Sequence, residues 1–578
     1  MPFFTREVNR ARLDKTFLFL TGVMFLVAPS FYHVNLGEGG FYLPFNALTW
    51  LFAAFLAGAS LLVAAHNGRI TFPPLFLSFA LFGLAVLVLG LIGEKPVMET
   101  WAFRLLTIFS GLLLYWALCQ FDIDERKADL LILIVVCSAS LQAIYCWLQL
   151  LLGEGVPLFI PVSPDVPRGI FQQQNLAATY TATGVMGCLY LLAKPRGWLG
   201  AVLAFLLCLN LSVVLMSGSR IGLLAVFLGV LCFFLSSPRL RHPRTLIPLL
   251  LAFSLAMLAS VTFNDGGGIG RAVSKFNAVV QADTLGRGDV RKTIYDSSFD
   301  LFLQKPWLGH GIGNFERVWQ DYKPEYHAKN PHAAHVEKRL THPHNELLLW
   351  AVEGGVVLFL FLGLIAYGVV RLLASLGWRE GLRWLAILSP VVLHTQVEKP
   401  FYISHLHLVL LVFLLVILVR GHDRGQVFEL GFSGKVGSLV LAVSVPVFGS
   451  AVLSHTMLAN YYITQATFFQ ATPMELVRFA KGNPFFNRRA GFLEKQAQLR
   501  TGLRSGDRGL LADYVTWGRA YLEQVPSPVV MADVAVALYE LGRISETRAL
   551  LNRLQEIYPF SPSVNDARDY LARRGFYF

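Results

Sequence analysis

The chain has 578 residues, of which 55% are hydrophobic and 15% charged, and its mean hydropathy of +0.54 is too high for an ordinary soluble protein. Its net charge of +12 could indicate nucleic-acid binding, but much of that charge lies in short segments between apolar runs, where membrane topology explains it. All six cysteines lie within or at the ends of apolar runs, which argues against a disulfide framework or a cysteine-based metal site. We therefore expect a membrane protein that binds no nucleic acid.

Apolar runs long enough to cross a bilayer recur along most of the chain. A helix that crosses a hydrocarbon core of roughly 30 Å needs about 20 mostly apolar residues. The predicted spans are residues 16–32, 45–65, 72–93, 100–119, 130–152, 176–194, 198–216, 220–236, 245–263, 347–370, 384–397, 406–420 and 437–454. No small-residue cleavage site follows the first span, so we expect a retained helix rather than a signal peptide. The predicted fold class is an all-α, polytopic membrane protein with about thirteen transmembrane helices.

Basic residues are distributed unevenly between the loops that connect these spans. With the N-terminus in the cytoplasm, the cytoplasmic loops contain Arg69, Arg126, Lys127, Lys194, Arg196, Arg239, Arg241, Arg244, Arg379, Arg383, Arg424 and Lys435. The short loops on the other side contain few basic residues, which is the positive-inside pattern. This orientation places a loop near 153–175, a large loop at 264–346 and the tail on the outer face.

After the last predicted span the composition becomes that of a soluble protein. Residues 473–578 alternate apolar and charged residues at helical spacing. Residues 535–563 predict two amphipathic helices joined at Gly542 and Arg543, and they resemble a single tetratricopeptide-type hairpin, which cannot bury its apolar face alone. We therefore predict a transmembrane domain at 1–454, including the large loop, and a small helical domain at 455–578 in which neighbouring helices complete the core.

Two polar motifs lie at the predicted outer ends of spans in the first half of the chain. Gln173 and Asn175, in RGIFQQQNLAATY (168–180), could bind sugar hydroxyls or an acceptor backbone, or could be ordinary loop amides. The stretch SGSR (217–220) places Arg220 at the start of a span. A charged side chain at mid-depth in a bilayer costs about 2.5–3.5 kcal/mol, so we expect either an anionic partner such as a diphosphate or an arginine that reaches the lipid headgroups.

The large loop is rich in glycine and histidine. Its stretch GRGDVRKTIYDSSFDLFLQKPWLGHGIGNF (286–315) carries Arg291 fifteen residues before Pro306, and a glycine-rich turn follows. No strand-to-helix context surrounds these glycines, so we reject a Rossmann or P-loop site. Five histidines also gather in this loop, namely His327, His332, His335, His342 and His344. Their spacing matches no familiar zinc pattern, and we predict no metal.

The stretch HPHNE (342–346) ends the large loop directly before a long apolar run. Pro343 suits the first turn of a helix, which would leave His342 or the residue before it as the cap. His344 would then lie at the outer mouth of the next span. A histidine titrates near pH 6.5 and suits general-base catalysis on a hydroxyl, whereas an isolated interfacial histidine more often bonds to headgroups.

The stretch HTQVEKPFYISHLH (394–407) lies between the last predicted spans. Pro400 interrupts its apolar pattern and predicts a short re-entrant or broken segment, which is tolerated at membrane depth only where it lines a cavity. Glu398, Lys399 and Tyr402 would then face that cavity.

Taken in order, these motifs resemble the O-antigen ligase superfamily, which includes lipopolysaccharide O-antigen ligases, O-antigen polymerases and bacterial protein O-oligosaccharyltransferases. SGSR resembles the family's Ser-Arg pair, Arg291 with PWLGHGIGNF its arginine and following glycine turn, and HPHNELLLWAVEGG (342–355) its His-Asn motif. QQQN (172–175) and HTQVEKP (394–400) are similar to motifs of the PglL-type protein O-oligosaccharyltransferases, although Gln174 stands where that family usually has proline.

The resemblance implies transfer of a preassembled oligosaccharide from undecaprenyl diphosphate to a serine or threonine of a periplasmic protein such as a type IV pilin. It also implies a multi-pass protein of the bacterial cytoplasmic (inner) membrane, surrounded by membrane lipids, whose active site faces the periplasm and needs no cofactor or metal. Arg220 and Arg291 would bind the diphosphate, and His344 would take the proton from the acceptor hydroxyl. The residues that would contact the glycan or the acceptor are Gln173, Asn175, His342, Asn345, Glu398 and Tyr402.

Two alternatives stay open. A lipopolysaccharide O-antigen ligase or polymerase would use the same chemistry with a glycan acceptor instead of a protein. A transporter or flippase fits the polytopic architecture, but it would be expected to show internal repeats and charges at the membrane midplane. Here the polar motifs collect on the predicted outer face, which favours an enzyme.

Overall fold

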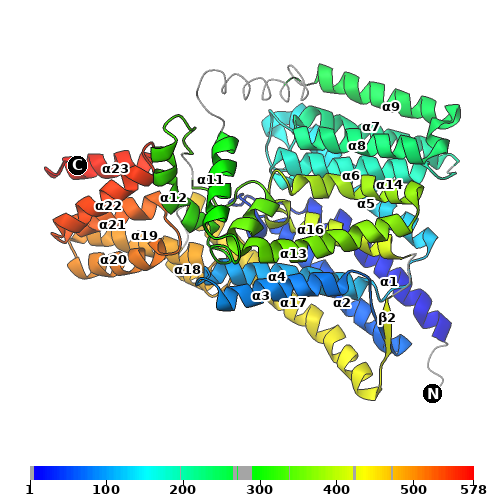
Figure 1. Cartoon of the computed structure of the whole chain (residues 1–578), viewed down its shortest axis with the longest axis horizontal. Helices are drawn as coiled ribbons and strands as arrows, with labels where there is room; N and C mark the ends of the chain where they lie inside the picture. The colour runs from blue at the N-terminus through cyan, green and yellow to red at the C-terminus, as the bar shows by residue number, and fades with distance from the viewer. Residues whose placement is uncertain are drawn as a thin grey trace. The chain divides into compact units, whose positions relative to one another are not determined.

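The computed structural model of the chain describes residues 6–195, 197–263, 270, 290–336, 339–420, 425–469 and 473–577, and it is mostly helical (Figure 1). The helices are α1 (Arg6–Leu26), α2 (Pro44–Asn67), α3 (Phe76–Ile92), α4 (Met98–Leu118), α5 (Glu125–Leu152), α6 (Gln174–Leu192), α7 (Leu199–Ser217), α8 (Arg220–Ser236), α9 (Pro243–Thr262), α11 (Val290–Gln304), α12 (Phe315–Lys329), α13 (Glu346–Ser375), α14 (Trp378–His394), α15 (Pro400–Ile403), α16 (His405–Val419), α17 (Phe432–Phe468), α18 (Met474–Lys481), α19 (Asn487–Ser505), α20 (Arg508–Leu522), α21 (Pro528–Glu540), α22 (Ile544–Ile557) and α23 (Pro562–Ala572). Two short strands, β1 (Arg69–Phe72) and β2 (Gln426–Glu429), complete the described elements.

A helix coincides with each of the thirteen predicted spans, from α1 to α17. By length and composition, eight of the described helices are long and apolar enough to cross a membrane, and they are α1, α2, α4, α5, α7, α9, α13 and α17. Three further apolar helices, α3, α8 and α16, are shorter. The chain is therefore a multi-pass membrane protein, and the number of thirteen spans stays a prediction.

The chain divides into two compact units, each assembled from stretches that are far apart in the sequence. The first unit consists of Met1–Leu81, Thr107–Phe276 and Gly363–Thr464. The second unit consists of Phe82–Leu106, Asn277–Leu362 and Gln465–Phe578. The C-terminal residues thus group with the second half of the predicted large loop.

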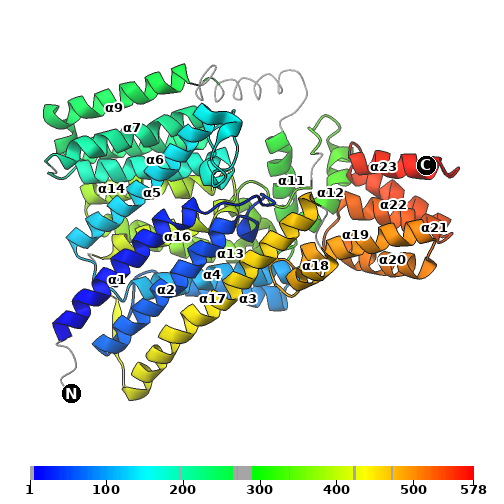
Figure 2. The same cartoon turned by 180° about the vertical axis from the view of Figure 1, so that it is seen from behind.

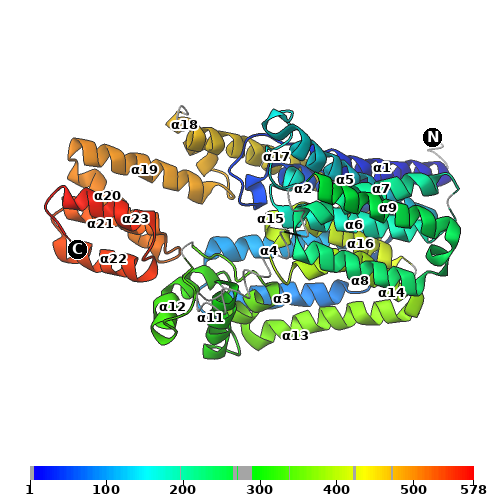
Figure 3. The ribbon, with the colours of Figure 1, turned by 90° about the horizontal axis from the view of Figure 1, so that it is seen from above.

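Helix α6 is the central helix of the first unit, and every residue from Leu176 to Leu192 is buried. It packs against α5, α7, α8 and α14 (Figure 3). Small residues allow this close packing, since a Cβ atom added at Gly184 would lie 2.6 Å from the Cβ of Ala139. Small residues at helix contacts are the usual means of tight packing in a bilayer, where burial of apolar surface adds little driving force.

Helices α1, α2 and α17 run side by side in the same unit (Figure 2). Gly58 of α2 lies against Pro446 and Ala442 of α17, where an added Cβ would approach to 2.6 Å and 2.7 Å. The contact again depends on a residue without a side chain.

The first unit also contains a short two-stranded sheet, which the prediction of an all-α fold did not include. Strands β1 and β2 pair antiparallel, with Arg69 opposite Glu429. Gln120 covers the free edge of β1, because its side-chain amide accepts from the Thr71 N–H and donates to the Thr71 carbonyl, both at 2.9 Å. Each strand has only four residues, too few for alternation to be recognised in the sequence.

The predicted large loop forms part of the second unit, although residues 264–269, 271–289 and 337–338 lie outside the described residues. It contains α11 and α12, which pack around Ile294, Phe315 and Trp319. Leu349 and Val352 of α13 join the same core. The loop is therefore a packed structure built on the start of α13.

The C-terminal residues of the second unit form helices α18 to α23, coloured orange to red in Figure 1. The predicted helix pair at 535–563 corresponds to α21 and α22, and the chain turns between them at Gly542, whose φ is 79°. Tyr514 and Val534 are buried on one side of the pair, and Leu554 on the other. The assignment to the tetratricopeptide type stays a prediction.

Candidate functional site

Two buried glutamines of α5 hold the loop that precedes α6 in the first unit. Gln142 accepts from the N–H of Ile170 at 3.1 Å, and Gln149 accepts from the N–H groups of Arg168 and Gly169 at 3.0 Å and 2.9 Å. Because the two glutamines are two helical turns apart, they face the same side of α5. They fix the backbone just before the QQQN motif.

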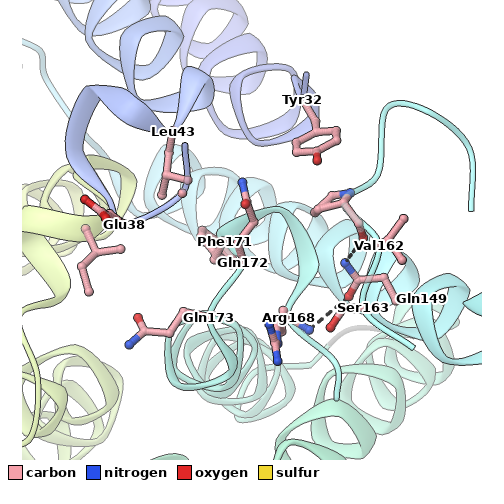
Figure 4. A pocket seen from close by; sticks show the side chains of 13 residues that line it. Tyr32, Glu38, Leu43, Gln149, Val162, Ser163, Arg168, Phe171, Gln172 and Gln173 are labelled. Carbon is pink, nitrogen blue, oxygen red and sulfur yellow. Dashed lines mark hydrogen bonds between the residues drawn. The ribbon is translucent and has the colours of Figure 1, made fainter. Parts of the chain in front are cut away.

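A cavity of about 480 Å³ lies at this loop (Figure 4). Its lining consists of Tyr32, Gly37, Glu38, Leu43, Gln149, Pro161, Val162, Ser163, Arg168, Phe171, Gln172, Gln173 and Ile403. The charged groups are Glu38 and Arg168, and three glutamines contribute amides. Among the described residues, Oε1 of Gln173 has no hydrogen-bond partner. One charge of each sign together with several amides suits a polar, hydroxyl-bearing or peptide-like ligand.

The QQQN motif makes the turn that starts α6. Gln172 has a left-handed backbone with φ 57°, which is uncommon for a residue with a side chain, and its Nε2 donates to Oδ1 of Asn35 at 3.1 Å. Gln173 stands at the N-cap position of α6 but forms no capping hydrogen bond with its side chain, and Gln174 is the first residue of the helix. Proline is favoured at the first position of a helix. Gln174 occupies that position here, so the Gln-Pro-Asn pattern to which QQQN was compared would allow the same helix start. Asn175 follows and is half-buried.

The stretch HTQVEKPFYISHLH binds to the same end of α6. Nδ1 of His394 lies 2.8 Å from Oγ1 of Thr179, and His407 donates from Nε2 to the carbonyl of Leu176 at 3.2 Å. These two contacts connect α14 and α16 to the first two turns of α6.

The predicted interruption at Pro400 is confirmed. Helix α14 ends before it, α15 forms a single turn, and α16 begins anew. Asn46 of α2 bridges the break, because its side chain donates to the carbonyl of Ile403 and accepts from the N–H of His405, both at 2.9 Å. From this broken segment, Ile403 lines the cavity of Figure 4.

Arg220 is the first residue of α8, and its side chain is exposed. Ser219 caps this helix by accepting from the N–H of Gly222 at 3.3 Å. Gly222 packs against Ala178 of α6, where an added Cβ would lie 3.0 Å from the alanine Cβ. The SGSR motif therefore begins a helix beside the first turns of α6.

The HPHNE motif in the second unit has a different local structure from the one predicted. Helix α13 begins at Glu346, and Asn345 caps it by accepting from the N–H of Leu348 at 2.9 Å. The prediction that Pro343 lies in the first helical turn is wrong. The reason is the left-handed backbone of His344, with φ 55°, which no residue inside an α-helix can adopt.

His344 is held on both sides. Its N–H donates to Nδ1 of His342 at 2.8 Å, and its carbonyl accepts from the hydroxyl of Tyr295 at 3.3 Å. Since Nδ1 of the buried His342 accepts, a neutral ring carries its proton on Nε2, which lies 3.5 Å from Oε1 of Glu346. A strained backbone of this kind costs about 1–2 kcal/mol and persists only where neighbours enforce it.

The glycine-rich turn after Pro306 packs onto α13. The N–H of His310 donates to the carbonyl of Val352 at 2.8 Å. An added Cβ at Gly309, whose φ is 67°, would lie 2.4 Å from the carbonyl carbon of Glu353. Gly355 breaks the helix at this point, with φ 62° and ψ −160°. The glycines therefore serve a close contact between two backbones.

Glu353 anchors this turn from the interior of the second unit. It is fully buried, and it accepts from Nη2 of Arg104 at 3.0 Å and from the N–H groups of Gly313 and Phe315 at 2.8 Å and 3.1 Å. The Arg104 guanidinium also lies 5.2 Å from the centre of the Trp350 ring. This pair was not predicted from the sequence, although a carboxylate within an apolar run was a signal for it.

A mainly apolar groove of about 610 Å³ runs between α11 and α13 beside this segment. Its lining consists of Tyr295, Asp296, Phe299, Phe302, Asn345, Leu347, Leu348, Ala351, Val356 and Phe359. Arg291 is half-buried in the first turn of α11, one turn before Tyr295. The groove thus has an apolar body and a polar end near the HPHNE motif.

Two of the five loop histidines form a stacked pair. The rings of His327 and His335 lie 4.0 Å apart at an angle of 15°. Burial, together with electrostatic interactions with His335 and Lys323, lowers the pKa of His327 to about 4, and burial lowers the pKa of Lys323 to about 8. Among the residues that the structure describes, no group of three or more histidine, cysteine, aspartate or glutamate side chains could hold a metal ion.

The predicted site residues fall into two sets, one in each unit. The first unit contains Gln173, Asn175, Arg220, Glu398 and Tyr402. The second unit contains Arg291, His342, His344 and Asn345. In the first set, His394 and Gly222, from stretches next to the predicted residues, contact α6, and in the second set Tyr295 of α11 contacts His344. Gln149 and Glu353, the buried groups that hold these segments, were not among the predicted residues.

Comparison with known protein families gives two matches. Residues 202–363 match the family described as O-antigen ligase, and this range includes SGSR, Arg291 and HPHNE. Residues 383–568 match the family described as virulence factor membrane-bound polymerase, C-terminal, and this range includes the broken segment and most of the C-terminal helices. No curated protein matches the chain.

Proposed function

We propose that the chain is a glycan-transferring membrane enzyme of the O-antigen ligase superfamily, to whose families two of its stretches are similar. In this proposal it moves a preassembled oligosaccharide from undecaprenyl diphosphate to a serine or threonine of a periplasmic protein. The observation that carries the proposal is the geometry of His344. Its backbone is held in a left-handed conformation between His342 and Tyr295, at the polar end of an apolar groove.

His344 acts as the general base in this proposal. The acceptor oxygen attacks the anomeric carbon and gives its proton to His344, while the bond between that carbon and the diphosphate oxygen breaks. The electron pair of the broken bond leaves with the diphosphate, and the anomeric centre inverts. A base must be positioned within hydrogen-bond reach of the hydroxyl, and the fixed backbone of His344 supplies such positioning.

The donor has a charged head and a long apolar chain, and the second unit offers a surface for each. The apolar groove between α11 and α13 suits the polyprenyl chain. Arg291, one turn before Tyr295, is the residue of this unit that we propose to bind the diphosphate. Arg220 of the first unit is proposed as a second ligand of the diphosphate because of its resemblance to the family's Ser-Arg pair. Arginine forms paired, charge-assisted hydrogen bonds with phosphate oxygens and stabilises the charge that grows on the leaving group.

Two motifs favour a protein acceptor. QQQN and HTQVEKP resemble stretches of the PglL-type enzymes. QQQN forms the start of α6 and lines the cavity of Figure 4 with Gln172 and Gln173, and His394 of HTQVEKP contacts Thr179 of the same helix. Amide groups such as that of Gln173 can hydrogen-bond a peptide backbone or sugar hydroxyls. His342, Asn175, Glu398 and Tyr402 are the further contacts proposed for glycan or acceptor.

The test is a His344→Ala variant in cells that contain the glycan pathway, with His332→Ala as the matched control, because His332 is an exposed histidine of the same loop. Loss of the base should reduce transfer by about 10²–10⁴-fold, and the control should leave it unchanged. Full glycosylation by His344→Ala would refute the assignment of the base.

The arginines are tested by Arg220→Lys and Arg291→Lys, which keep the charge but lose the bidentate geometry. Transfer should fall in both variants, and the KM for the donor should rise. Undiminished turnover in both would contradict diphosphate binding by these residues.

A second candidate function has support from the matched family descriptions, which name an O-antigen ligase and a membrane-bound polymerase. Such an enzyme would transfer the glycan to a lipopolysaccharide core or to a growing glycan. Mass spectrometry of secreted proteins and gel analysis of lipopolysaccharide from a deletion strain separate the two. Loss of a glycan mass on a protein supports our proposal, and loss of the O-antigen ladder supports the second candidate.

A further inference from the structure

A cavity of about 990 Å³ lies within the second unit, away from the predicted site residues. One wall is the segment Glu94–Met98 before α4, a second is the start of α12, and the third is formed by helices α20, α21 and α22 of the C-terminal region. The cavity thus lies between residues of the predicted large loop and the C-terminal helices.

The walls are joined by specific contacts. Arg553 of α22 forms an ion pair with Asp321 of α12 at 2.8 Å, and Lys323 of α12 lies 4.5 Å from the centre of the Tyr558 ring. Asn314, just before α12, donates to the carbonyl of Lys95 at 3.0 Å. The cavity therefore remains open although the segments around it are bonded to one another. Helix α12 lies beside the C-terminal helices in Figure 1.

The lining is chemically mixed. Val97 and Leu538 are buried apolar side chains, and four acidic and four basic residues surround them. Within the described part of the chain, Lys95, Arg317 and Glu523 make no ion pair. The cavity consequently offers apolar contacts together with groups of both signs that are available to a ligand.

This chemistry distinguishes between possible acceptors. A lipid A core carries several phosphates, and a surface that binds it should have a clear excess of basic residues. A lining with equal numbers of acidic and basic groups lacks that excess. A polypeptide carries side chains of both signs and apolar side chains, and a groove beside packed helical hairpins is a common place for such a ligand.

The cavity also adjoins the glycine-rich turn that packs onto α13. Asn314 lines the cavity and donates to the carbonyl of His310 at 2.9 Å, within the glycine-rich turn. The N–H of Phe315 next to it donates to Glu353 of α13. A protein bound in the cavity would therefore lie against the glycine-rich turn, which packs onto α13, the helix that begins two residues after the proposed base.

We propose that this cavity binds a segment of the acceptor protein, so that the C-terminal helices and the start of α12 together recognise the protein substrate. The inference rests on the proposed function, because it requires a protein acceptor. It assigns substrate recognition to residues outside the site of transfer, with Arg317, Ala549 and Glu523 in direct contact with the acceptor.

The test is Ala549→Trp, which fills the cavity from an exposed position of α22. The matched control is Gln555→Trp, an exposed position of the same helix that does not line the cavity. Arg317→Glu reverses one available charge. The enzyme is the full chain in detergent, the donor is undecaprenyl-diphosphate oligosaccharide, and the acceptor is a secreted protein that loses its glycan in the His344→Ala strain.

Ala549→Trp and Arg317→Glu should each raise the KM for the acceptor protein by about tenfold or more, with kcat and the KM for the donor unchanged. Gln555→Trp should match the wild-type enzyme. Unchanged acceptor KM in both cavity variants would overturn the inference. If Ala549→Trp fails to fold, the Arg317→Glu result alone decides in the same way.

Failure of the inference can be distinguished from failure of the proposed function. If no secreted protein loses its glycan in the His344→Ala strain while the O-antigen ladder is lost, the protein acceptor and the docking cavity are both refuted. If the protein glycan is lost but the cavity variants bind the acceptor normally, only the docking cavity is refuted. A photo-crosslinker at position 549 that captures the identified acceptor, with none captured from position 555, supports the inference.

Discussion

Replacement of Glu353 by glutamine should loosen the glycine-rich turn that packs onto α13. The Glu353 side chain is fully buried and accepts hydrogen bonds from Arg104, Gly313 and Phe315. Glu353→Gln keeps the shape but removes the carboxylate charge that faces the Arg104 guanidinium, which is 7% exposed. Removal of one partner from a buried ion pair costs about 3–5 kcal/mol.

The effect should be visible in hydrogen exchange at the amides of Gly313 and Phe315. If opening of the turn becomes easier by about 3 kcal/mol, exchange at these two amides should accelerate by about 10²-fold. The amides of α21, in a separate core, should keep their protection. Glycan transfer should fall together with the protection, because Phe315 after the turn, α11 and the first turns of α13 share one core beside His344.

The double variant Arg104→Met with Glu353→Gln provides the control. It removes both charges, so no unpaired charge stays buried, and it should recover part of the lost protection. Equal protection of Gly313 and Phe315 in wild type and Glu353→Gln would refute the view that Glu353 anchors the turn. Equal loss in the single and double variants would show that the charge of Arg104 is not the cause.

Three further outcomes follow from the structure. Gly309→Ala places a Cβ atom 2.4 Å from the carbonyl carbon of Glu353, at a residue whose φ is 67°. The substitution should make the turn sensitive to protease and lower glycan transfer. Gly363→Ala, which adds a Cβ atom in open space, should change neither property. Gln149→Leu leaves the N–H of Gly169 without its acceptor, at about 1–3 kcal/mol, and should speed exchange there. Burial and electrostatic interactions with His335 and Lys323 lower the pKa of His327 to about 4, whereas the unfolded chain has the ordinary value of about 6.5. The free energy of unfolding should therefore be constant above pH 6.5 and fall as the pH drops from 6.5 toward 4, because protonation favours the unfolded chain. Thermal unfolding should show this fall in the wild-type protein and a smaller one in His327→Gln.

The positions of the helices could be predicted from the sequence because they depend on a local property. A run of about 20 apolar residues satisfies its own backbone only as a helix in a bilayer, and each predicted span does coincide with one. The start of α13 was placed wrongly for a different reason. Pro343 suits a helix start, but the hydrogen bond from His344 to His342 and the Asn345 cap fix the helix three residues later. Asn345 followed by Glu346 was a capping signal in the sequence itself.

The groups that build the site could be predicted only in part. The motif residues were found because several unusual side chains stand next to one another in the chain. Arg104 and Glu353 are separated by 249 positions, and no spacing rule connects an arginine in one apolar run with a glutamate in another. The same holds for Asn46, which bridges a break in the chain 357 residues away. Such pairs exist only once the helices have packed.

The packing also explains why the arginine, glycine and histidine motifs occur together and in this order. The glycine-rich turn lies between Arg291 on α11 and the HPHNE segment, and it closes onto α13 at Val352, Glu353 and Gly355. Tyr295 of α11 then reaches the carbonyl of His344. Glycine is required in the turn because the two backbones are in contact, and a phosphate-binding loop would instead keep its N–H groups open to a ligand. Here the N–H groups of His310, Gly311 and Gly313 already donate to α13, so the turn does not offer them to a phosphate and serves the contact between two backbones.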